Sequence, residues 1–187
     1  MLNSILEGTD QKGYILPIKS VGVQGDARSY RNLCLLQGNQ IDFDWQEITS
    51  KAKEITDKIN TINRVGYILN KSNFEGQINC YDMRIADENV DLLRELDSIV
   101  TSKLEDAKVS QTFAVLIPIG ITKKNSVAIR TFVTNDFITG KPGEIGKEVA
   151  KEKVQEIVKA VEEKFGDKIE FIFYDVTSKP PATTEWQ

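Results

Sequence analysis

The last residues of the chain carry the densest set of groups that could do chemistry. Residues 174–187 read YDVTSKPPATTEWQ. The two prolines fix an extended path, which reduces the entropy that such a segment loses when it docks. Around them lie a cation, two hydroxyls and a carboxylate, supplied by Lys179, Thr183, Thr184 and Glu185. These groups suit the phosphate and base of a nucleotide. The same residues are equally consistent with a structural tail that is held in place by Trp186 and whose charged groups are solvated.

A glycine-rich stretch and a single arginine are weaker candidates. Residues 20–30 read SVGVQGDARSY, in which Gly22 and Gly25 allow positive φ or close backbone approach. Asp26 followed by Arg28 resembles an internally paired turn. The stretch could cradle an anion but lacks the Gly-Lys-Ser/Thr ending of a phosphate-binding loop, so we favour a structural turn. For Arg64, at the start of a predicted strand, we favour a surface salt bridge over a ligand contact.

Composition excludes several classes of site. The chain has no histidine, which removes Ser-His and Cys-His nucleophiles and the commonest zinc sites. Cys34 and Cys80 are not part of a C-x-x-C motif, so we expect reduced thiols, as in cytosolic proteins. A net charge of -4 argues against nucleic acid as the main ligand. The first residues lack the regions of a signal peptide, and the longest apolar run, residues 113–121, is far shorter than the roughly 20 residues that span a bilayer. We therefore expect a soluble cytoplasmic protein with no nucleic-acid or membrane partner.

The elements that must position these groups follow from periodicity. Short apolar runs predict strands over residues 14–20, 32–37, 63–69, 113–119, 127–133 and 169–175. Apolar residues that recur every three or four positions predict helices over residues 44–60, 88–104 and 147–165. Asp44 and Asp87 are predicted N-caps of the first two helices, and Gly166 is predicted to follow the last helix as its C′ residue.

The two halves of the 187-residue chain repeat one order of elements. A strand with an internal proline, Pro17 or Pro118, precedes a second strand, an amphipathic helix and a strand that contains a tyrosine. This predicts an α+β fold of two tandem degenerate β-β-α-β units, with mixed sheets and the helices on one face. We place the first unit at residues 1–75. Residues 76–187 then hold a linker, a joining helix and the second unit with its tail.

Particular segments resemble a known family. Residues 16–30 (LPIKSVGVQGDARSY) and 174–186 (YDVTSKPPATTEW) are similar to signature stretches of the GMP synthase C-terminal domain. Three further segments also resemble this domain: residues 63–65 (NRV), 110–116 (SQTFAVL) and 130–140 (RTFVTNDFITG). The resemblance covers nearly the whole chain from about residue 14, and the closing K-P-P-A-T-x-E-W pattern is highly specific. The order of the motifs resembles the two-copy animal-type arrangement, whereas ordinary bacterial enzymes carry one copy.

The resemblance implies a role in GMP and purine biosynthesis. In that family the domain dimerises the enzyme, a ligase, and helps to bind xanthosine 5′-monophosphate (XMP). An ATP-pyrophosphatase domain, which binds ATP and Mg, adenylates XMP, and a glutaminase domain supplies ammonia. By motif, Lys179 would contact the phosphate, Glu185 with the backbone near Thr184 would hold the base, and Gln111 would lie at the substrate edge. The catalytic motifs of the other two domains are absent here, so we expect no catalysis and no cofactor in this chain alone. The implied partners are XMP, those two domains and a second copy of the chain.

One departure from the family pattern affects the predicted site. The family has an arginine eight residues before the lysine of Lys-Pro-Pro, and this chain has Phe171 there. The first copy keeps the arginine as Arg64 but has Ser72 where the lysine would be. Either the site tolerates the loss, or Arg64 or Lys168 substitutes, or nucleotide binding is weakened roughly 10- to 100-fold.

Alternative functions are a stand-alone non-catalytic paralogue, which binds a purine nucleotide or scaffolds another protein, and a purely structural dimeriser.

Overall fold

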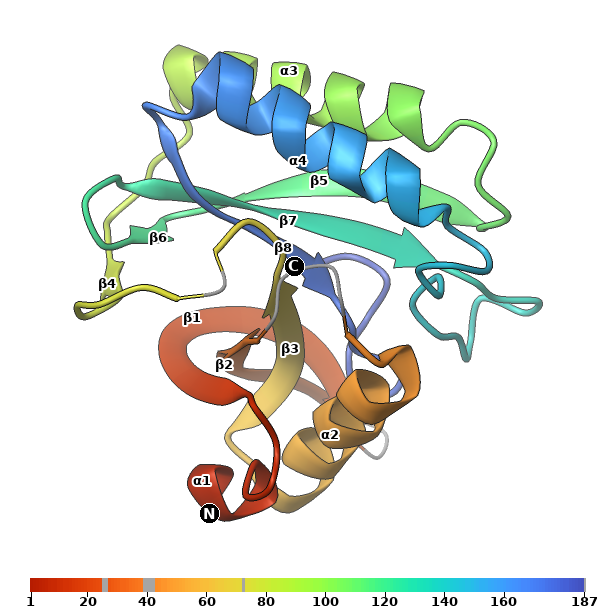
Figure 1. Ribbon diagram of the computed structural model, residues 1–187. Coiled ribbons are helices and arrows are strands. Elements are labelled where there is room, and N and C mark those ends of the chain that lie inside the picture. The colour runs from red at the N-terminus through yellow and green to blue at the C-terminus, as the bar shows by residue number, and fades with distance from the viewer. Residues whose placement is uncertain (25–26, 39–42, 72, 187) are drawn as a thin grey trace.

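Six strands form one mixed sheet in the order β1-β2-β3-β8-β7-β5 (Figure 1). The computed structural model describes residues 1–24, 27–38, 43–71 and 73–186. The strands of the large sheet are β1 (Lys12–Gln24), β2 (Ala27–Gln37), β3 (Ile62–Ile68), β5 (Gln111–Ile117), β7 (Asn125–Phe132) and β8 (Ile169–Asp175). The short strands β4 (Asn79–Cys80) and β6 (Ile119–Gly120) pair with each other beside it. The predicted α+β class is confirmed.

The helices pack on one face of the large sheet, where they share a single apolar core with it. They are α1 (Leu2–Ile5), α2 (Trp45–Lys58), α3 (Asp87–Lys103) and α4 (Lys151–Phe165). Figure 1 shows α3 and α4 over β5, β7 and β8, and α2 beside β1 to β3. A smaller core on the opposite face is closed by Ile78 from the segment between the halves and by Trp186 from the tail.

The strand order is the same when read from either edge of the sheet. In each half the first two strands are antiparallel and the last strand returns parallel to the second, after α2 or α4. The halves meet at the antiparallel pair β3 and β8, where Tyr67 lies opposite Tyr174. Arg64 and Phe171 each lie three residues before one of these tyrosines, so they occupy corresponding positions in β3 and β8. The predicted β-β-α-β order thus occurs twice, whereas the duplication and its boundary at residue 75 stay predictions.

Helix α2 begins where its predicted N-cap residue, Asp44, places it. The Asp44 carboxylate accepts hydrogen bonds from the amides of Gln46 and Glu47, at 2.8 and 3.1 Å, which satisfies two free amides of the first turn. The prediction for Asp87 was wrong by one residue, because Ala86 is the N-cap of α3 and no side chain caps the helix. An acidic residue still sits in the first turn, where it favours the positive end of the helix dipole.

The last helix ends at Phe165 as predicted, but its start and its capping glycine differ from the prediction. It begins at Lys151, four residues later than predicted. Gly166 is the C-cap, with a right-handed φ of -62°, so the prediction of a C′ glycine was wrong. Its missing Cβ has a steric role instead, because a Cβ there would lie 2.3 Å from the carbonyl oxygen of Glu162.

The glycine-rich stretch is mostly strand. Residues 20–24 and 27–30 pair antiparallel as the ends of β1 and β2, so the anion cradle does not form from them, and Gly25 and Asp26 lie outside the described residues. The predicted close backbone approach at Gly22 is confirmed. A Cβ there would lie 2.6 Å from the Pro181 carbonyl oxygen and 2.5 Å from Asn63 Nδ2.

Two further observations concern sites that the composition disfavoured. Cys34 is buried and Cys80 is exposed, and both are free thiols. Burial raises the pKa of Cys34 to about 12, so this thiol is unreactive at neutral pH. Across the described residues, no helix is both long and apolar enough to cross a membrane.

Candidate functional site

The tail after β8 lies along the outer edge of β1. The amide of Val23 donates to the Pro181 carbonyl at 2.7 Å, and the amide of Val21 donates to the Trp186 carbonyl at 3.0 Å. Between these bonds, Gly22 and Ala182 form an antiparallel bridge. The tail therefore covers backbone groups that an edge strand would otherwise leave open.

A buried ionic cluster of Arg64, Arg130 and Asp175 contacts the tail. Arg64 and Arg130 flank the carboxylate of Asp175 with nitrogen–oxygen distances of 2.6 and 3.3 Å, and all three side chains are 0% exposed. Burial opposes ionisation of Asp175, but the two guanidinium groups outweigh it and lower the pKa of the carboxyl group. Burial lowers the pKa of Arg130 to about 10, which leaves this group charged at neutral pH. The cluster thus carries one more cation than anion.

Tail carbonyls and an aromatic ring contact the terminal guanidinium groups of the two arginines, whereas both Nε atoms are buried without a partner among the described residues. Arg64 Nη2 donates to the carbonyls of Glu185 at 2.7 Å and Thr183 at 3.3 Å. Its guanidinium carbon lies 4.6 Å from the centre of the Trp186 ring. Arg130 donates to the carbonyls of Thr177 at 2.7 Å and Thr183 at 3.3 Å. Unpaired buried charges are expensive, so the docked tail and the cluster depend on each other.

Arg64 therefore lies in the interior, and the preference for a surface salt bridge was wrong. Its partner Asp175 is 111 residues later in the chain, a distance over which sequence spacing gives no information about contact. Sequence reasoning also missed Arg130 and Asp175 as members of the cluster. The available signal was the occurrence of charged residues within largely apolar runs, Arg130 in residues 127–133 and both Glu170 and Asp175 in residues 169–175, because such charges are rarely buried without a partner.

Lys179 is fixed by the loop that follows β7. Its ammonium group donates to the Phe137 carbonyl. Its backbone exchanges two hydrogen bonds with Gly140, at 2.9 and 3.1 Å. The peptide bonds Lys179–Pro180 and Pro180–Pro181 are both cis. The half-buried lysine is thus held through its backbone, and within the described ranges its charge faces only a neutral acceptor.

Glu185 and Trp186 line a groove of about 620 Å³ between the opposite edge strands β1 and β5. The walls are largely apolar and include Pro17 and Phe113. Glu185 is exposed and its backbone carbonyl is engaged by Arg64. The Trp186 ring is 6% exposed, and its Nε1 is buried without a partner among the described residues. A planar ring with N–H groups and an acceptor would suit these walls.

The other predicted contacts lie near this groove or outside it. Gln111 is exposed at the start of β5, opposite Phe132, two residues before the groove wall at Phe113. Thr184 is half-buried beside Glu185. The structure brings Arg64 of β3 into contact with the tail segment that contains Thr184 and Glu185, and it places Gln111 at the start of the edge strand β5. Their contacts with a substrate stay predictions.

Phe171 replaces the family arginine as a core residue. Its ring is 0% exposed and lies 5.0 Å from the ring of Phe74, with the Lys71 ammonium 5.6 Å from its centre. The proposed substitute Lys168 precedes β8, whereas Lys179 follows this seven-residue strand. Opposite ends of such a strand are about 20 Å apart, so Lys168 lies far from Lys179, and its substitution for the missing arginine stays a prediction. Ser72 lies outside the described residues.

Comparison with known proteins identifies the family. Residues 97–186 match the family model described as the GMP synthase C terminal domain. The chain contains a GMP synthase C-terminal domain. It is 36% identical over 194 residues to the glutamine-hydrolysing GMP synthase of Dictyostelium discoideum, and 35% identical over 186 residues to a probable GMP synthase of Leptospira interrogans. Each match covers 94% of this chain, but only 27% and 29% of those proteins.

A third relative matches a shorter stretch of this GMP synthase domain. The GMP synthase of Thermus thermophilus is 35% identical over 115 residues, which is 55% of this chain and 22% of that protein. Relatives therefore differ in whether they match about half of the chain or nearly all of it. This difference is in keeping with the predicted two-copy arrangement, which stays a prediction.

Proposed function

We propose that this chain forms the XMP-binding and dimerisation part of a glutamine-hydrolysing GMP synthase, acting in GMP biosynthesis in the cytoplasm. The ATP-pyrophosphatase and glutaminase activities would come from other domains, since the chain spans only about a quarter of the relatives that it matches along its length. The observation that carries the proposal is the docked tail. Its backbone is fixed from Asp175 to Trp186, so Lys179 and Glu185 are presented from one immobile segment.

Each predicted contact has a physical basis. A phosphate would compete well for the Lys179 ammonium, because an anionic acceptor adds a Coulombic attraction that the neutral Phe137 carbonyl does not supply. The Glu185 carboxylate can accept from purine N–H groups while Trp186 and Phe113 contact the ring. Gln111 lies at the outer edge of this arrangement. Fixing these groups in advance lowers the entropy cost of binding.

Isothermal titration of XMP tests this proposal in the presence of the partner ATP-pyrophosphatase domain. Lys179→Ala should weaken binding roughly 10- to 100-fold through the loss of one charge-assisted contact. Lys168→Ala is the matched control, because Lys168 is exposed and lies at the far end of β8, and it should bind XMP as the wild type does. An absence of XMP binding with the partner domain present, or equal binding by the Lys179 variant, would overturn the proposal.

Dimerisation is tested separately by sedimentation equilibrium. The chain has a mass of 21.1 kDa, and a homodimer would sediment at twice this mass at micromolar concentrations. The edge strand β5 is a natural contact, because its outer backbone is only partly covered: Asp97 of α3 accepts from the Ala114 amide at 2.8 Å. A monomer at all concentrations would remove dimerisation from the proposed function.

A second candidate function is a stand-alone, non-catalytic protein that binds a purine nucleotide or scaffolds another protein. The buried Phe171, in place of the family arginine, favours it. Titration of GMP and XMP into the chain alone separates the two candidates. Tight binding without any partner domain would support the stand-alone protein, and binding that requires the partner domain would support the GMP synthase part.

A further inference from the structure

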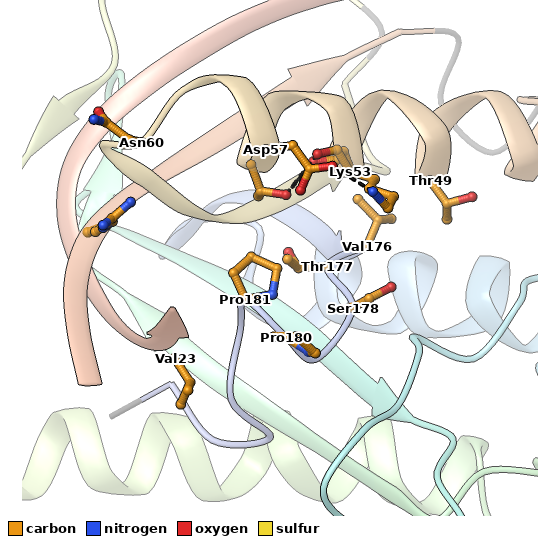
Figure 2. Close-up of a pocket in the computed structure, with 13 residues that line it drawn as sticks. Val23, Thr49, Lys53, Asp57, Asn60, Val176, Thr177, Ser178, Pro180 and Pro181 are labelled. Carbon is orange, nitrogen blue, oxygen red and sulfur yellow. Dashed lines mark hydrogen bonds and ion pairs between the residues drawn. The ribbon is translucent and has the colours of Figure 1, made fainter. Parts of the chain in front are cut away.

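A second hollow lies between α2 and the far side of the tail. It has a volume of about 600 Å³, which is within the range of small-molecule sites. Figure 2 shows Thr49 and Lys53 on α2 and Asn60 just beyond the end of this helix, with Ser178 and Pro181 on the other side of the hollow. Neither Lys179 nor Glu185 contributes to its lining, so this hollow is separate from the proposed XMP site.

Several polar groups around the hollow have no partner in the described part of the chain. They are the Arg31 guanidinium, the Asn60 amide and the Ser178 hydroxyl, for which the structure contains no side-chain hydrogen bond or ion pair. Lys53 pairs with Asp57 at 2.5 Å. Two cations against one carboxylate leave an excess positive charge. A hollow with this charge and these open donors favours an anionic ligand.

The polar groups are separated along the length of α2. Arg31 precedes Asn32, whose amide donates to the Thr61 carbonyl at 2.8 Å, which places Arg31 at the Asn60 end of the hollow. Lys53 is five residues, or about 7.5 Å, before the end of α2 at Lys58, and Asn60 lies in the turn beyond that end. Between the two ends, Pro181 and the side of α2 at Ala52 supply apolar surface. A ligand that uses both ends must be elongated, with an apolar middle.

We propose that this hollow binds a phosphate monoester of a sugar, either free or as part of a mononucleotide. The planar Arg31 guanidinium and the Asn60 amide take the phosphate, since arginine can bind two phosphate oxygens at once. The Asp57 carboxylate accepts from sugar hydroxyls, and Lys53 and Ser178 bind acceptor atoms at the other end. The hollow can hold such a ligand without rearrangement of the sheet, because its lining residues come from α2, β1, β2 and the tail.

Occupancy of this hollow would act on the tail. Ser178, Pro180 and Pro181 flank Lys179 and form one wall, so a ligand that bridges them to α2 stabilises the docked tail. If Lys179 binds XMP, which rests on the proposed function, the two ligands then favour each other's binding. The site itself does not depend on that role.

Isothermal titration of ribose 5-phosphate, adenosine 5′-monophosphate and inorganic phosphate into the whole chain tests the site. We expect at least one of the two esters to bind more tightly than inorganic phosphate, and Arg31→Ala to weaken that binding at least tenfold. Arg28→Ala is the matched control, because residue 28 lies in the same strand but its side chain points to the opposite face. Arg28→Ala should bind as the wild type does. Preference for the nucleotide over the sugar phosphate would show that the ligand includes a base, and the reverse would show a free sugar phosphate.

Nuclear magnetic resonance supplies a readout of location. The side-chain amide signals of Asn60 and the backbone amide signal of Ser178 should shift on titration of the ester that binds. The proposal is overturned if neither ester binds at millimolar concentration, if inorganic phosphate binds as well as the esters, or if Arg31→Ala has no effect. Binding lost in Lys179→Ala instead would assign the ester to the other site. Because no partner domain or XMP is present, these results are independent of whether the proposed GMP synthase function holds.

Discussion

The two halves of the molecule use corresponding positions for different purposes. Position 64 in β3 is an arginine that binds Asp175 and the tail carbonyls, whereas position 171 in β8 is a phenylalanine packed against Phe74. Both side chains are fully buried. The first half thus carries a charge whose counter-ion and tail acceptors belong to the second half. The second half has an apolar residue there, and its tail relies on the arginine of the first. The comparison indicates that the tail can be positioned only when both halves are folded together.

Removing the arginine of the first half should have the largest effect. Arg64→Met leaves Asp175 with Arg130 alone and removes the hydrogen bonds to two tail carbonyls, so we expect a loss of about 3–5 kcal/mol in the free energy of unfolding. Urea unfolding measures this loss. In a Trp45→Phe background, the emission of Trp186 should also move to longer wavelength as the tail leaves its site. Arg94→Met is the control, because Arg94 is 74% exposed, and it should change stability by less than about 0.5 kcal/mol. Unchanged stability and emission in Arg64→Met would contradict the anchoring role.

The residues just before these two positions differ as well. Before Arg64, Asn63 Oδ1 accepts a hydrogen bond from the Ser20 hydroxyl at 2.8 Å. Before Phe171, the buried Glu170 carboxylate accepts hydrogen bonds from Lys71 and from the amides of Thr122 and Lys123. Burial opposes ionisation of Glu170, but these hydrogen bonds outweigh it and lower its pKa to about 2. Its carboxylate therefore stabilises the fold above its ordinary pKa of 4.5, and this contribution is lost as the pH falls toward 2.

Glu170→Gln should accordingly cost about 2–3 kcal/mol at pH 7. The difference in urea midpoint between wild type and variant should shrink between pH 4.5 and pH 2, because the wild-type carboxylate becomes protonated there. Equilibrium unfolding at pH 7, 4 and 2.5 measures it. If the difference in urea midpoint stays constant over this pH range, the charge of Glu170 is not what stabilises its contacts with Thr122 and Lys123.

The contact between tail and β1 can be tested by a single methyl group. Gly22→Ala places a Cβ within 2.6 Å of the Pro181 carbonyl oxygen, so either the tail or Asn63 must move. We expect a loss of about 1–3 kcal/mol, typical of overpacking. Hydrogen exchange should show faster exchange at the Val23 amide, which donates to that carbonyl. Wild-type exchange at Val23 would mean that the tail accommodates the methyl group without leaving β1.

The smallest effect is expected at the phenylalanine of the second half. Phe171→Leu keeps an apolar side chain of similar size and loses only the ring contacts with Phe74 and Lys71. The cost should be below about 1.5 kcal/mol, measured by thermal unfolding. XMP binding in the presence of the partner domain should not change. A variant that loses XMP binding while remaining folded would show that this ring serves the substrate site.

The sequence predicted the elements well and their connections poorly. Apolar periodicity found every strand of the large sheet and the three long helices, because each buries one regular face. The pairing of β3 with β8 could not be read from it, since strand pairing depends on contacts between distant residues. The same limit explains Arg64. A lone arginine resembles a surface residue until its partner, 111 residues away, is known.

The candidate site was predicted in part. The tail was singled out from its prolines, lysine and carboxylate, and the structure shows how its backbone is fixed. The hollow beside α2 was not found, because Arg31 and Asn60 stand in unrelated segments of the sequence and only the fold brings them together. The glycine-rich stretch was misread as a turn over most of its length, since its valines and serines pair as strand.

The buried cluster also bears on the order in which the chain can fold during synthesis. Arg64 leaves the ribosome long before its partners, which lie 111 to 121 residues later. Amino-terminal units usually fold first as they emerge, but here the early half would have to enclose a charge with no counter-ion. Until residues 175–186 are translated, this half should remain open around Arg64 and accessible to chaperones. Ribosome-bound chains stopped before and after residue 175 would differ in protease resistance across residues 12–68.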